Sequence, residues 1–339
     1  GDSTRLHLDR CLTCRACESV CPSGVRYGRL VEIGRGLLEE QIKRPWAERF
    51  KRYLIRTVIP YPARMKLFLK PGQLLRPVLP GALKAHVPPK QRTGARPTQQ
   101  HKRVFLLLEG CVQSLATPNT NAATARVLDK LGIQVIPAPK TSCCGAVTYH
   151  NGDQPGGIQT IKDNIDAWWP PLQNGCEGIL FTASGCGAHI KEYREILQHD
   201  PDYAKKASYV SEHAFDLSQI VAAAPAKRLA HTGNGQRIAF HAPCTLQHAL
   251  AINGCVEQIL QGAGYELSPV PNPHLCCGSA GTYSLLQPKI SSQLLNQKLD
   301  TLLAQQPSLI ATANIGCQMH LASRSSIPVV HWIELLDQD

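Results

Sequence analysis

Four cysteines recur with nearly the same spacing in two successive stretches of the chain, and this repeat restricts the fold more than any other feature. The first set is Cys111, Cys143, Cys144 and Cys186, and the second set is Cys244, Cys276, Cys277 and Cys317. In both sets 32 positions separate the single cysteine from the adjacent pair, and 42 or 40 positions separate the pair from the last cysteine. Unrelated segments rarely agree at so many points, so we expect two copies of one module.

The residues around these cysteines predict an α/β module with a parallel sheet. The stretches "VFLLLEGC" and "RIAFHAPC" are typical of short apolar strands that end at a cysteine. Next come an amphipathic helix, a glycine stop at Gly132 or Gly264, and a second strand, in "NTNAATARVLDKLGIQVIPA" and "LQHALAINGCVEQILQGAGYELSPV". After the pair we expect another helix and a third strand, "GILFTAS" or "LIATAN". The cysteines then lie just past the carboxyl ends of the strands, where parallel sheets gather ligands and helix N-termini favour thiolates.

Each adjacent cysteine pair is followed at once by glycine, in "TSCCGAVTYH" and "HLCCGSAGTY". One backbone turn can present both thiolates to an iron–sulfur cluster, and Gly145 or Gly278 gives that turn room. A core thiol or a vicinal disulfide is the alternative, but repetition of the whole set argues against both. Cys176 and Cys255 have no counterpart in the other module, so we expect them to be buried structural thiols.

Several histidines accompany the repeated cysteines. His189 and His320 each stand three residues beyond the last cysteine of a set, where a fifth ligand could lie, although a histidine at a helix start often has only a local hydrogen bond. His241, His248 and His274 lie beside the second set and have no matching histidine in the first. If they do more than pack, they tune a cluster or carry protons in the second module alone.

A different cysteine pattern lies near the N-terminus. The run "CLTCRACESVCP" supplies four cysteines before a proline: Cys11, Cys14, Cys17 and Cys21. This is the bacterial ferredoxin spacing for a [4Fe–4S] cluster, whereas zinc usually takes two separated cysteine pairs. In two-cluster ferredoxins the fourth cysteine of such a run ligates the other cluster. Either Cys21 completes its own cluster or a partner run precedes Gly1, and we expect the second arrangement because the chain starts abruptly.

Composition separates this chain from secreted and membrane-spanning proteins. With 339 residues and 43% hydrophobic content it can bury a core without its 14 cysteines forming disulfide staples. No apolar run approaches the roughly 18 to 20 residues of a membrane span, and the start has no apolar signal-peptide region. We therefore expect a reducing cytoplasm, in which clustered thiolates bind metal or do redox work.

The net charge of +11 is concentrated in one segment, because residues 41–103 hold 16 Lys or Arg and one acid, Glu48. Prolines at 60, 62, 71, 77 and 80 should divide this basic linker into short helices and turns. Its Arg, Lys, Leu and aromatic residues suit docking on a flavoprotein partner, contact with an anionic membrane surface, or a solvated linker. No nucleic-acid-binding motif accompanies the basic residues, so we expect no nucleic acid partner.

Two common cofactor motifs are missing from the sequence. We find no G-x-G-x-x-G after a strand and no G-x-x-x-x-G-K-[ST], so neither a dinucleotide nor an ATP phosphate has an evident binding loop. This favours an electron carrier, with hydride chemistry in another chain.

Together the motifs resemble those of the iron–sulfur subunit of glycolate oxidase, nearly from end to end. The motifs that carry the resemblance are "CLTCRACESVCPSGVRYGRL", "NTNAATARVLDKLGI", "NIDAWWP", "TASGCGAHIKEY", "PCTLQHA", "LCCGSAGTY" and "TANIGCQMHLAS". The two CCG modules are also similar to those found in heterodisulfide reductase. The resemblance implies [4Fe–4S] ligation by the ferredoxin-type cysteines, and further iron–sulfur clusters on the eight repeat cysteines.

The same resemblance implies a role in a larger assembly. The chain would receive electrons from flavin-containing subunits that oxidise glycolate to glyoxylate and pass them toward quinone. It would be cytoplasmic and peripheral on the inner face of the cell membrane. Two departures stand out: one ferredoxin run is present where the family has two, and His189 and His320 stand where the heterodisulfide reductase type has the second cysteine of a C-x-x-C pair.

We therefore expect an α/β fold with four parts. These are a small α-helical ferredoxin-type segment (1–40), a basic proline-rich linker (41–103) and two CCG modules with parallel sheets (104–232 and 233–339). The same motifs suit subunits of lactate, glycerol-3-phosphate or heterodisulfide oxidoreductases. A zinc-stabilised interaction module without electron transfer is the alternative from another class.

Overall fold

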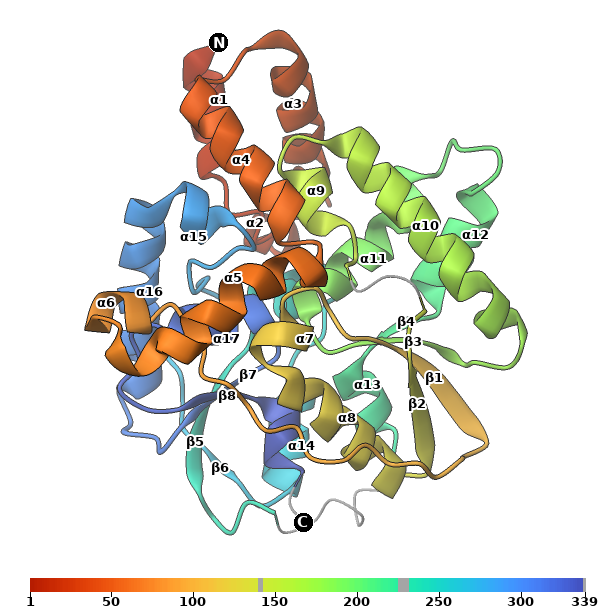
Figure 1. Ribbon diagram of the computed structural model, residues 1–339, viewed down its shortest axis with the longest axis vertical. Coiled ribbons are helices and arrows are strands. Elements are labelled where there is room, and N and C mark those ends of the chain that lie inside the picture. The colour runs from red at the N-terminus through yellow and green to blue at the C-terminus, as the bar shows by residue number, and fades with distance from the viewer. Residues whose placement is uncertain (140–142, 225–231, 338–339) are drawn as a thin grey trace.

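The computed structural model describes residues 1–139, 143–224 and 232–337, and its helices surround two parallel β-sheets (Figure 1). The strands are β1 (Arg103–Leu108), β2 (Ile133–Pro137), β3 (Gly178–Phe181), β4 (Ala214–Asp216), β5 (Arg237–His241), β6 (Glu266–Leu267), β7 (Ile310–Thr312) and β8 (Val329–His331). The strand order is β2-β1-β3-β4 in one sheet and β6-β5-β7-β8 in the other, with every neighbouring pair parallel. The identical order confirms two copies of one α/β module with parallel sheets.

Helices cover both faces of each sheet. In the first module they are α7 (Gln113–Ala116), α8 (Pro118–Lys130), α9 (Ala146–His150), α10 (Gln154–Gln173), α11 (Ser184–Ile196), α12 (Ala204–Glu212) and α13 (Leu217–Ala222). In the second module they are η3 (Thr245–Ala249), α14 (Cys255–Gly262), α15 (Tyr283–Leu286), α16 (Pro288–Leu303), α17 (Ile315–Ala322) and η4 (Trp332–Leu335).

Successive side chains along each strand point to opposite faces of the sheet, so they pack against different helices. In β1, Phe105 and Leu107 belong to a core that both modules share, whereas Leu106 and Leu108 face α10, α11 and α12. Both sides are buried, which explains why the strand is a continuous apolar run. The shared core also holds residues of α8, α13, α14 and η4, so the two modules pack as one body.

Two elements differ from the sequence expectation. Each sheet has a fourth strand, β4 or β8, which was not predicted because three residues are too few to establish an alternating pattern. The first helix of the second module is divided into η3 and α14. Ala251 (φ +55°) and Gly254 (φ +73°) adopt left-handed conformations between these elements, which ends one helix before the next begins.

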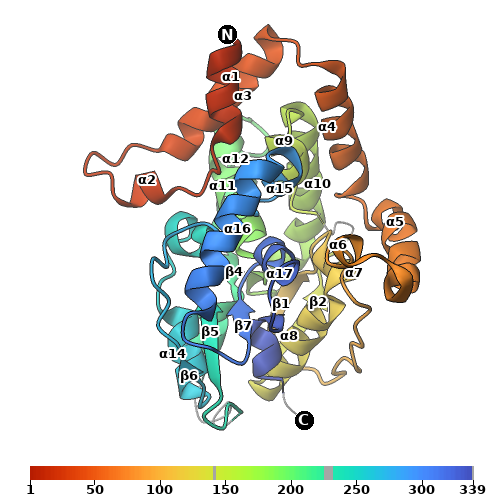
Figure 2. The ribbon, with the colours of Figure 1, turned by 90° about the vertical axis from the view of Figure 1, so that its left-hand side faces the viewer.

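The N-terminal part is helical and lies against the carboxyl ends of the strands (Figures 1 and 2). Its helices are α1 (Asp2–Arg10), α2 (Ala16–Ser19), α3 (Tyr27–Gln41), α4 (Trp46–Val58), α5 (Pro62–Leu75), η1 (Arg76–Val78) and α6 (Gly81–Lys84). The basic linker is divided into helices and turns as predicted, but α4 and α5 are 13 and 14 residues long and therefore not short, and Pro71 lies inside α5 and does not end it. None of the described helices combines the length and apolar character needed to span a bilayer.

A buried ion-pair network fixes the N-terminal helices to one another. The Arg44 guanidinium donates to Asp9 of α1 at 2.6 Å and to Glu39 of α3 at 2.5 Å. Arg52 of α4 donates to the same Asp9 at 3.3 Å. Part of the positive charge in residues 41–103 therefore serves the interior of the protein and does not face solvent.

Candidate cluster-binding site

The second set of cysteines converges at the carboxyl edge of its sheet. Cys244 follows β5, the pair lies in the loop before α15, and Cys317 is the third residue of α17. The Sγ atoms of Cys244 and Cys276 are 4.0 Å apart. The thiols of Cys277 and Cys317 and a ring nitrogen of His241 all lie within 4.8 Å of one another. The spacing of the repeat therefore brings four thiols to one place.

The first set has the same arrangement. Cys111 lies just after β1, and Cys186 is the third residue of α11. The Cys143 thiol is hydrogen-bonded to those of Cys111 and Cys144, and Cys144 is hydrogen-bonded to Cys186. The last cysteine of each set thus stands in the first turn of a helix.

Glycine makes the turn after each pair. Gly145 (φ +93°) and Gly278 (φ +87°) are left-handed, and their amides donate to Sγ of Cys143 at 3.4 Å and of Cys276 at 3.3 Å. A Cβ on Gly278 would lie 2.6 Å from the carbonyl oxygen of Ser291. The glycine therefore provides both the turn and the close approach that we expected from the sequence.

Electrostatics distinguish the first cysteine of each adjacent pair from the thiols that are hydrogen-bonded to it. Hydrogen bonds from the neighbouring thiols, Cys244 and Cys277, with help from the Gly278 amide, hold the pKa of Cys276 well below its ordinary value. A hydrogen bond with Cys276, together with burial, raises the pKa of Cys244 and Cys277. Cys143 repeats the behaviour of Cys276 in the first set. Several buried thiols cannot ionise together unless a cation compensates their charge, so the donor chemistry fits a metal centre.

The N-terminal run forms a compact loop. Thr13 (φ +52°) and Arg15 (φ +61°) are left-handed, and the Thr13 amide donates to Cys11 Sγ at 3.4 Å. The pKa of Cys14 is raised, mainly because the side chain is buried. A hydrogen bond from the Ala16 amide lowers this pKa, whereas the nearby charges of Cys276, Cys11 and Cys17 raise it. Cys14 therefore lies within electrostatic range of the second module's set.

Cys21, the fourth cysteine of the run, has surroundings of its own. Hydrogen bonds from the amides of Val25 and Ser23 and from the Tyr27 hydroxyl lower the pKa of its thiol. Within the run, Cys11 lines the cavity described below, whereas Cys14, Cys17 and Cys21 do not.

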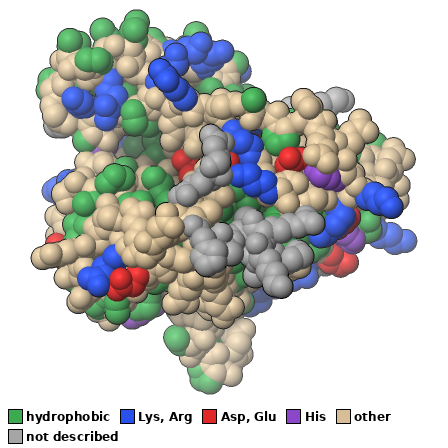
Figure 3. Space-filling view, turned by 90° about the horizontal axis from the view of Figure 1, so that it is seen from below, with side chains coloured by type: hydrophobic (Ala, Val, Ile, Leu, Met, Phe, Trp, Pro, Cys, Tyr) green, Lys and Arg blue, Asp and Glu red, His purple; other side chains and the backbone are tan. Residues whose placement is uncertain are grey.

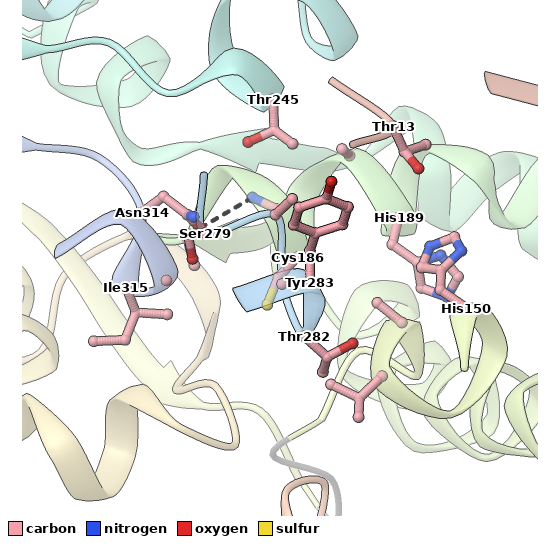
Figure 4. A pocket seen from close by; sticks show the side chains of 18 of the residues that line it. Thr13, His150, Cys186, His189, Thr245, Ser279, Thr282, Tyr283, Asn314 and Ile315 are labelled. Carbon is pink, nitrogen blue, oxygen red and sulfur yellow. Dashed lines mark hydrogen bonds between the residues drawn. The ribbon is translucent and has the colours of Figure 1, made fainter. Parts of the chain in front are cut away.

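A single cavity of about 550 Å³ connects the three sets. The cysteines that line it come from the N-terminal loop and from both modules: Cys11, Cys111, Cys144, Cys186, Cys244, Cys276 and Cys317. Figure 4 shows Thr13 of the loop, Cys186 and His189 of the first module, and Tyr283 and Asn314 of the second around this space. The fold thus places three thiol-rich segments around one cavity.

Comparison with known proteins agrees with this geometry. The family model for the CCG cysteine-rich domain matches residues 105–191 and 238–322, which are the two modules. The chain is 51% identical over 336 residues to the glycolate oxidase iron–sulfur subunit of Escherichia coli (strain K12), covering 99% of this chain and 82% of that protein. The chain belongs to the family of glycolate oxidase iron–sulfur subunits.

More distant relatives share the same framework. A probable glycolate oxidase iron–sulfur subunit of Bacillus subtilis (strain 168) is 28% identical over 93% of this chain and 76% of its own length. Lactate utilization protein A of Geobacillus thermodenitrificans (strain NG80-2) is 25% identical over 67% of this chain and 95% of its own length. Family membership confirms the resemblance inferred from the motifs.

The histidines that follow the last cysteines differ between the modules. His320 Nε2 is hydrogen-bonded to Ser291 Oγ at 3.0 Å, which is the local alternative expected from the sequence. His189 is 2% exposed, and neither of its ring nitrogens has a hydrogen-bond partner within the described ranges. Burial, followed by the charges of His150 and Arg15, lowers its pKa well below the ordinary value.

Of the three histidines expected beside the second set, only His241 is close to it. His241 Nδ1 pairs with Thr312 Oγ1 at 3.0 Å, and burial, then Lys298, lowers its pKa to about 3. His248 is instead 3.1 Å from Ser19 Oγ of α2, and the His274 side chain is exposed.

Cys176 and Cys255 lie outside the cavity, as expected, but the prediction that they are buried was wrong. Both are half-buried, and Cys255 Sγ donates to the Ser218 carbonyl at 3.5 Å. Their positions near element ends explain the partial exposure.

The sequence alone did not single out two groups near the first set. His150 at the end of α9 and Glu192 on α11 lie beside His189, with one ligand atom of each within 4.8 Å of the others. Glu192 follows His189 by three positions on a helix, which is a readable signal, whereas His150 approaches only through tertiary packing.

Proposed function

We propose that this chain is the electron-transfer subunit of a glycolate oxidase complex. Flavin-containing partner subunits oxidise glycolate to glyoxylate, releasing two electrons and two protons, and this chain passes the electrons toward quinone. The observation that supports this most is the convergence of cysteines from three separate segments on one cavity. An electron path through a protein needs redox centres close together, and twelve thiols in three sets supply ligands for several such centres.

We propose the ligands set by set. The N-terminal loop holds a [4Fe–4S] cluster through Cys11, Cys14 and Cys17, with Cys21 the remaining thiolate of the run. The modules hold iron–sulfur clusters through Cys111, Cys143, Cys144 and Cys186, and through Cys244, Cys276, Cys277 and Cys317. When bound, such clusters supply one-electron redox chemistry. The chain supplies thiolates, amide hydrogen bonds to sulfur, and burial that excludes water.

We also propose that α4, α5 and α6 contact an anionic membrane surface at the cytoplasmic face. Residues 49–108 contain no acidic side chain, and Trp46, Leu67, Phe68 and Leu74 are among the most exposed large hydrophobic residues. The lobe at the upper left of Figure 3 has hydrophobic and Lys or Arg side chains together, without Asp or Glu. A surface that is both basic and apolar suits the boundary between headgroups and acyl chains. The flavin subunits then bind elsewhere on the chain.

The experiment that tests the donor is reduction by substrate. The protein is purified anaerobically with its clusters bound and is mixed with the flavoprotein that copurifies with it. Glycolate is then added, and loss of the thiolate-to-iron absorption is followed over time. We expect bleaching that requires both the flavoprotein and glycolate. Bleaching with lactate but not with glycolate would instead favour a lactate complex, a second candidate supported by the likeness to lactate utilization protein A. Glycerol-3-phosphate and a heterodisulfide complete the substrate panel.

A zinc-stabilised interaction module is the remaining alternative. Such a protein would be colourless after anaerobic purification and would contain stoichiometric zinc. Visible absorption from thiolate-to-iron bands excludes it.

A further inference from the structure

The first module contains a group of polar side chains that the proposed cluster ligands do not include. His150 ends α9, His189 and Glu192 lie on α11, and all three line the cavity. The ring centroids of the two histidines are 5.0 Å apart, and Figure 4 shows the two imidazoles side by side. His189 Nδ1 is 3.8 Å from Glu192 Oε2.

His189 gives a second, independent reason to expect a ligand. Its side chain is almost completely buried, yet within the described part of the chain neither nitrogen has a hydrogen-bond partner. A buried imidazole without a partner costs free energy, because at least one N–H and one lone pair lose their water. A group that accepts a lone pair from His189 would remove this cost.

We propose that His150, His189 and Glu192 form a binding site for a mononuclear divalent metal ion, separate from the iron–sulfur clusters. Two imidazoles and one carboxylate are a donor set that suits Fe²⁺, Mn²⁺ or Zn²⁺ and leaves coordination positions open. All three side chains line the cavity, through which water or a small oxygen ligand could reach a bound ion.

The distances allow such a site after a small closure. Metal–ligand bonds of about 2.0 to 2.2 Å place neighbouring ligand atoms roughly 3 to 3.5 Å apart. The three ligand atoms already lie within 4.8 Å of one another, and His189 and Glu192 share one face of α11. We expect side-chain rotation to complete the geometry.

A second layer of side chains supports the three ligands. Glu32 of α3, only 4% exposed, places Oε1 3.5 Å from His150 Nδ1, and that oxygen has no hydrogen-bond partner among the described residues. A carboxylate behind a ligating histidine fixes its tautomer and orientation. Arg15 pairs with Glu192 Oε1, which leaves Oε2 toward His189.

The second module lacks this group at the matching positions. Six residues after the adjacent pair it has Tyr283 in place of His150, and six residues after its last cysteine it has Ser323 in place of Glu192. His320 matches His189 but is hydrogen-bonded to Ser291. The second module therefore serves as an internal control, because it has the matching histidine, His320, but lacks the other two proposed metal ligands.

Titration with Mn²⁺ tests the proposal, because carboxylate ligands suit Mn²⁺ whereas the soft thiolates of vacant cysteine sites favour other metals. The full chain with its clusters is titrated anaerobically, and free Mn²⁺ is measured from its room-temperature EPR signal. We expect one Mn²⁺ per chain. His150→Ala and His189→Ala should each weaken binding at least tenfold, Glu32→Gln should weaken it roughly tenfold to a hundredfold, and His320→Ala should leave it unchanged.

The proposal is wrong if the unmodified chain binds no Mn²⁺, or if His150→Ala binds it as tightly as the unmodified chain does. His150 is partly exposed, so this variant keeps the test valid even if His189→Ala fails to fold. Iron content is measured on the same samples. Loss of Mn²⁺ binding with iron retained supports a separate site, and the result does not depend on which substrate reduces the clusters.

Discussion

The amide of Gly278 donates to Sγ of Cys276 at 3.3 Å, and Gly145 repeats this contact with Cys143 at 3.4 Å. The left-handed turn that makes this bond also brings Gly278 against Ser291, where a Cβ would lie 2.6 Å from a carbonyl oxygen. The same residue therefore sets the direction of two thiols and the packing of α16.

Gly278→Ala should accordingly lose cluster iron and stability. Left-handed strain alone costs about 1 to 3 kcal/mol, and the contact with Ser291 adds to it. Gly281→Ala is the matched control, since Gly281 has φ +64° but open space around its Cβ position. Thermal unfolding and iron per chain should fall clearly more in Gly278→Ala than in Gly281→Ala, and equal effects would contradict the role given to the turn.

His241→Leu tests the asymmetry between the modules, because the first module has Leu108 at the matching position. His241 lies with Cys277 and Cys317 and is buried. We expect the variant to change the EPR spectrum of one cluster while the others keep theirs, since removing a neighbour of a metal ligand changes the affinity of the site about 10- to 100-fold. His274→Leu, at an exposed position, is the control. An unchanged spectrum would mean that His241 only packs.

His331 should make the pairing of the modules sensitive to acid. Its Nε2 bonds the Thr182 carbonyl at 2.8 Å, its Nδ1 accepts from the Ile333 amide at 3.2 Å, and burial lowers its pKa to about 4 from 6.5. A depressed folded-state pKa means that the unfolded chain binds the proton first. Neutral His331 therefore contributes about 3 kcal/mol to the free energy of unfolding. This contribution is fully present above pH 6.5 and is lost as the pH falls toward 4.

The measurement is the free energy of unfolding in denaturant between pH 7 and 4.5. The unmodified chain should lose more stability over this range than His331→Phe, whereas the exposed-site variant His7→Gln should behave like the unmodified chain. Parallel curves for all three proteins would refute this role of His331.

Membrane contact predicts a specific effect of substitutions on α5. Leu67 is 72% and Phe68 69% exposed, so replacing both with Glu removes apolar area from the contact and adds negative charge without disturbing the core. Burial of the Leu67 and Phe68 side chains in the membrane interface should contribute at least about 2 kcal/mol to the free energy of membrane binding. The double variant should therefore bind vesicles with anionic lipid more than roughly tenfold more weakly. The double variant Leu30→Glu, Leu37→Glu on α3 serves as control. If vesicle binding is unchanged but the flavoprotein no longer copurifies, the surface docks the partner subunit.

The sequence predicts those parts of the fold that depend on periodic or repeated signals. The spacing from Cys111 to Cys143 and from Cys244 to Cys276 is enough to expect two equivalent modules, and the apolar runs that end at cysteines locate the carboxyl edges of the sheets. Strands β4 and β8 have three residues each and carry too little pattern to be detected. The division of the helix near Ala251 depends on the left-handed conformations of Ala251 and Gly254, and an alanine in that conformation cannot be predicted from the sequence.

The site was predicted as far as each cysteine set is concerned, because each set follows from the repeat or from the ferredoxin spacing. The cavity that the three sets share was not predicted, because the approach of Cys14 to Cys276 depends on how the N-terminal helices pack on the modules. The group at His189 was missed for the same reason: His150 and Glu32 come from different helices, α9 and α3, and meet α11 only in the folded chain.

The most direct test of the central claim is iron and acid-labile sulfide per chain, with EPR before and after dithionite. It compares anaerobically purified chain with the double variant Cys276→Ser, Cys277→Ser. The account predicts clearly more than about four iron atoms per chain and loss of one distinct signal in the variant. Iron near four with an unchanged spectrum would show that the repeat cysteines hold no redox centre.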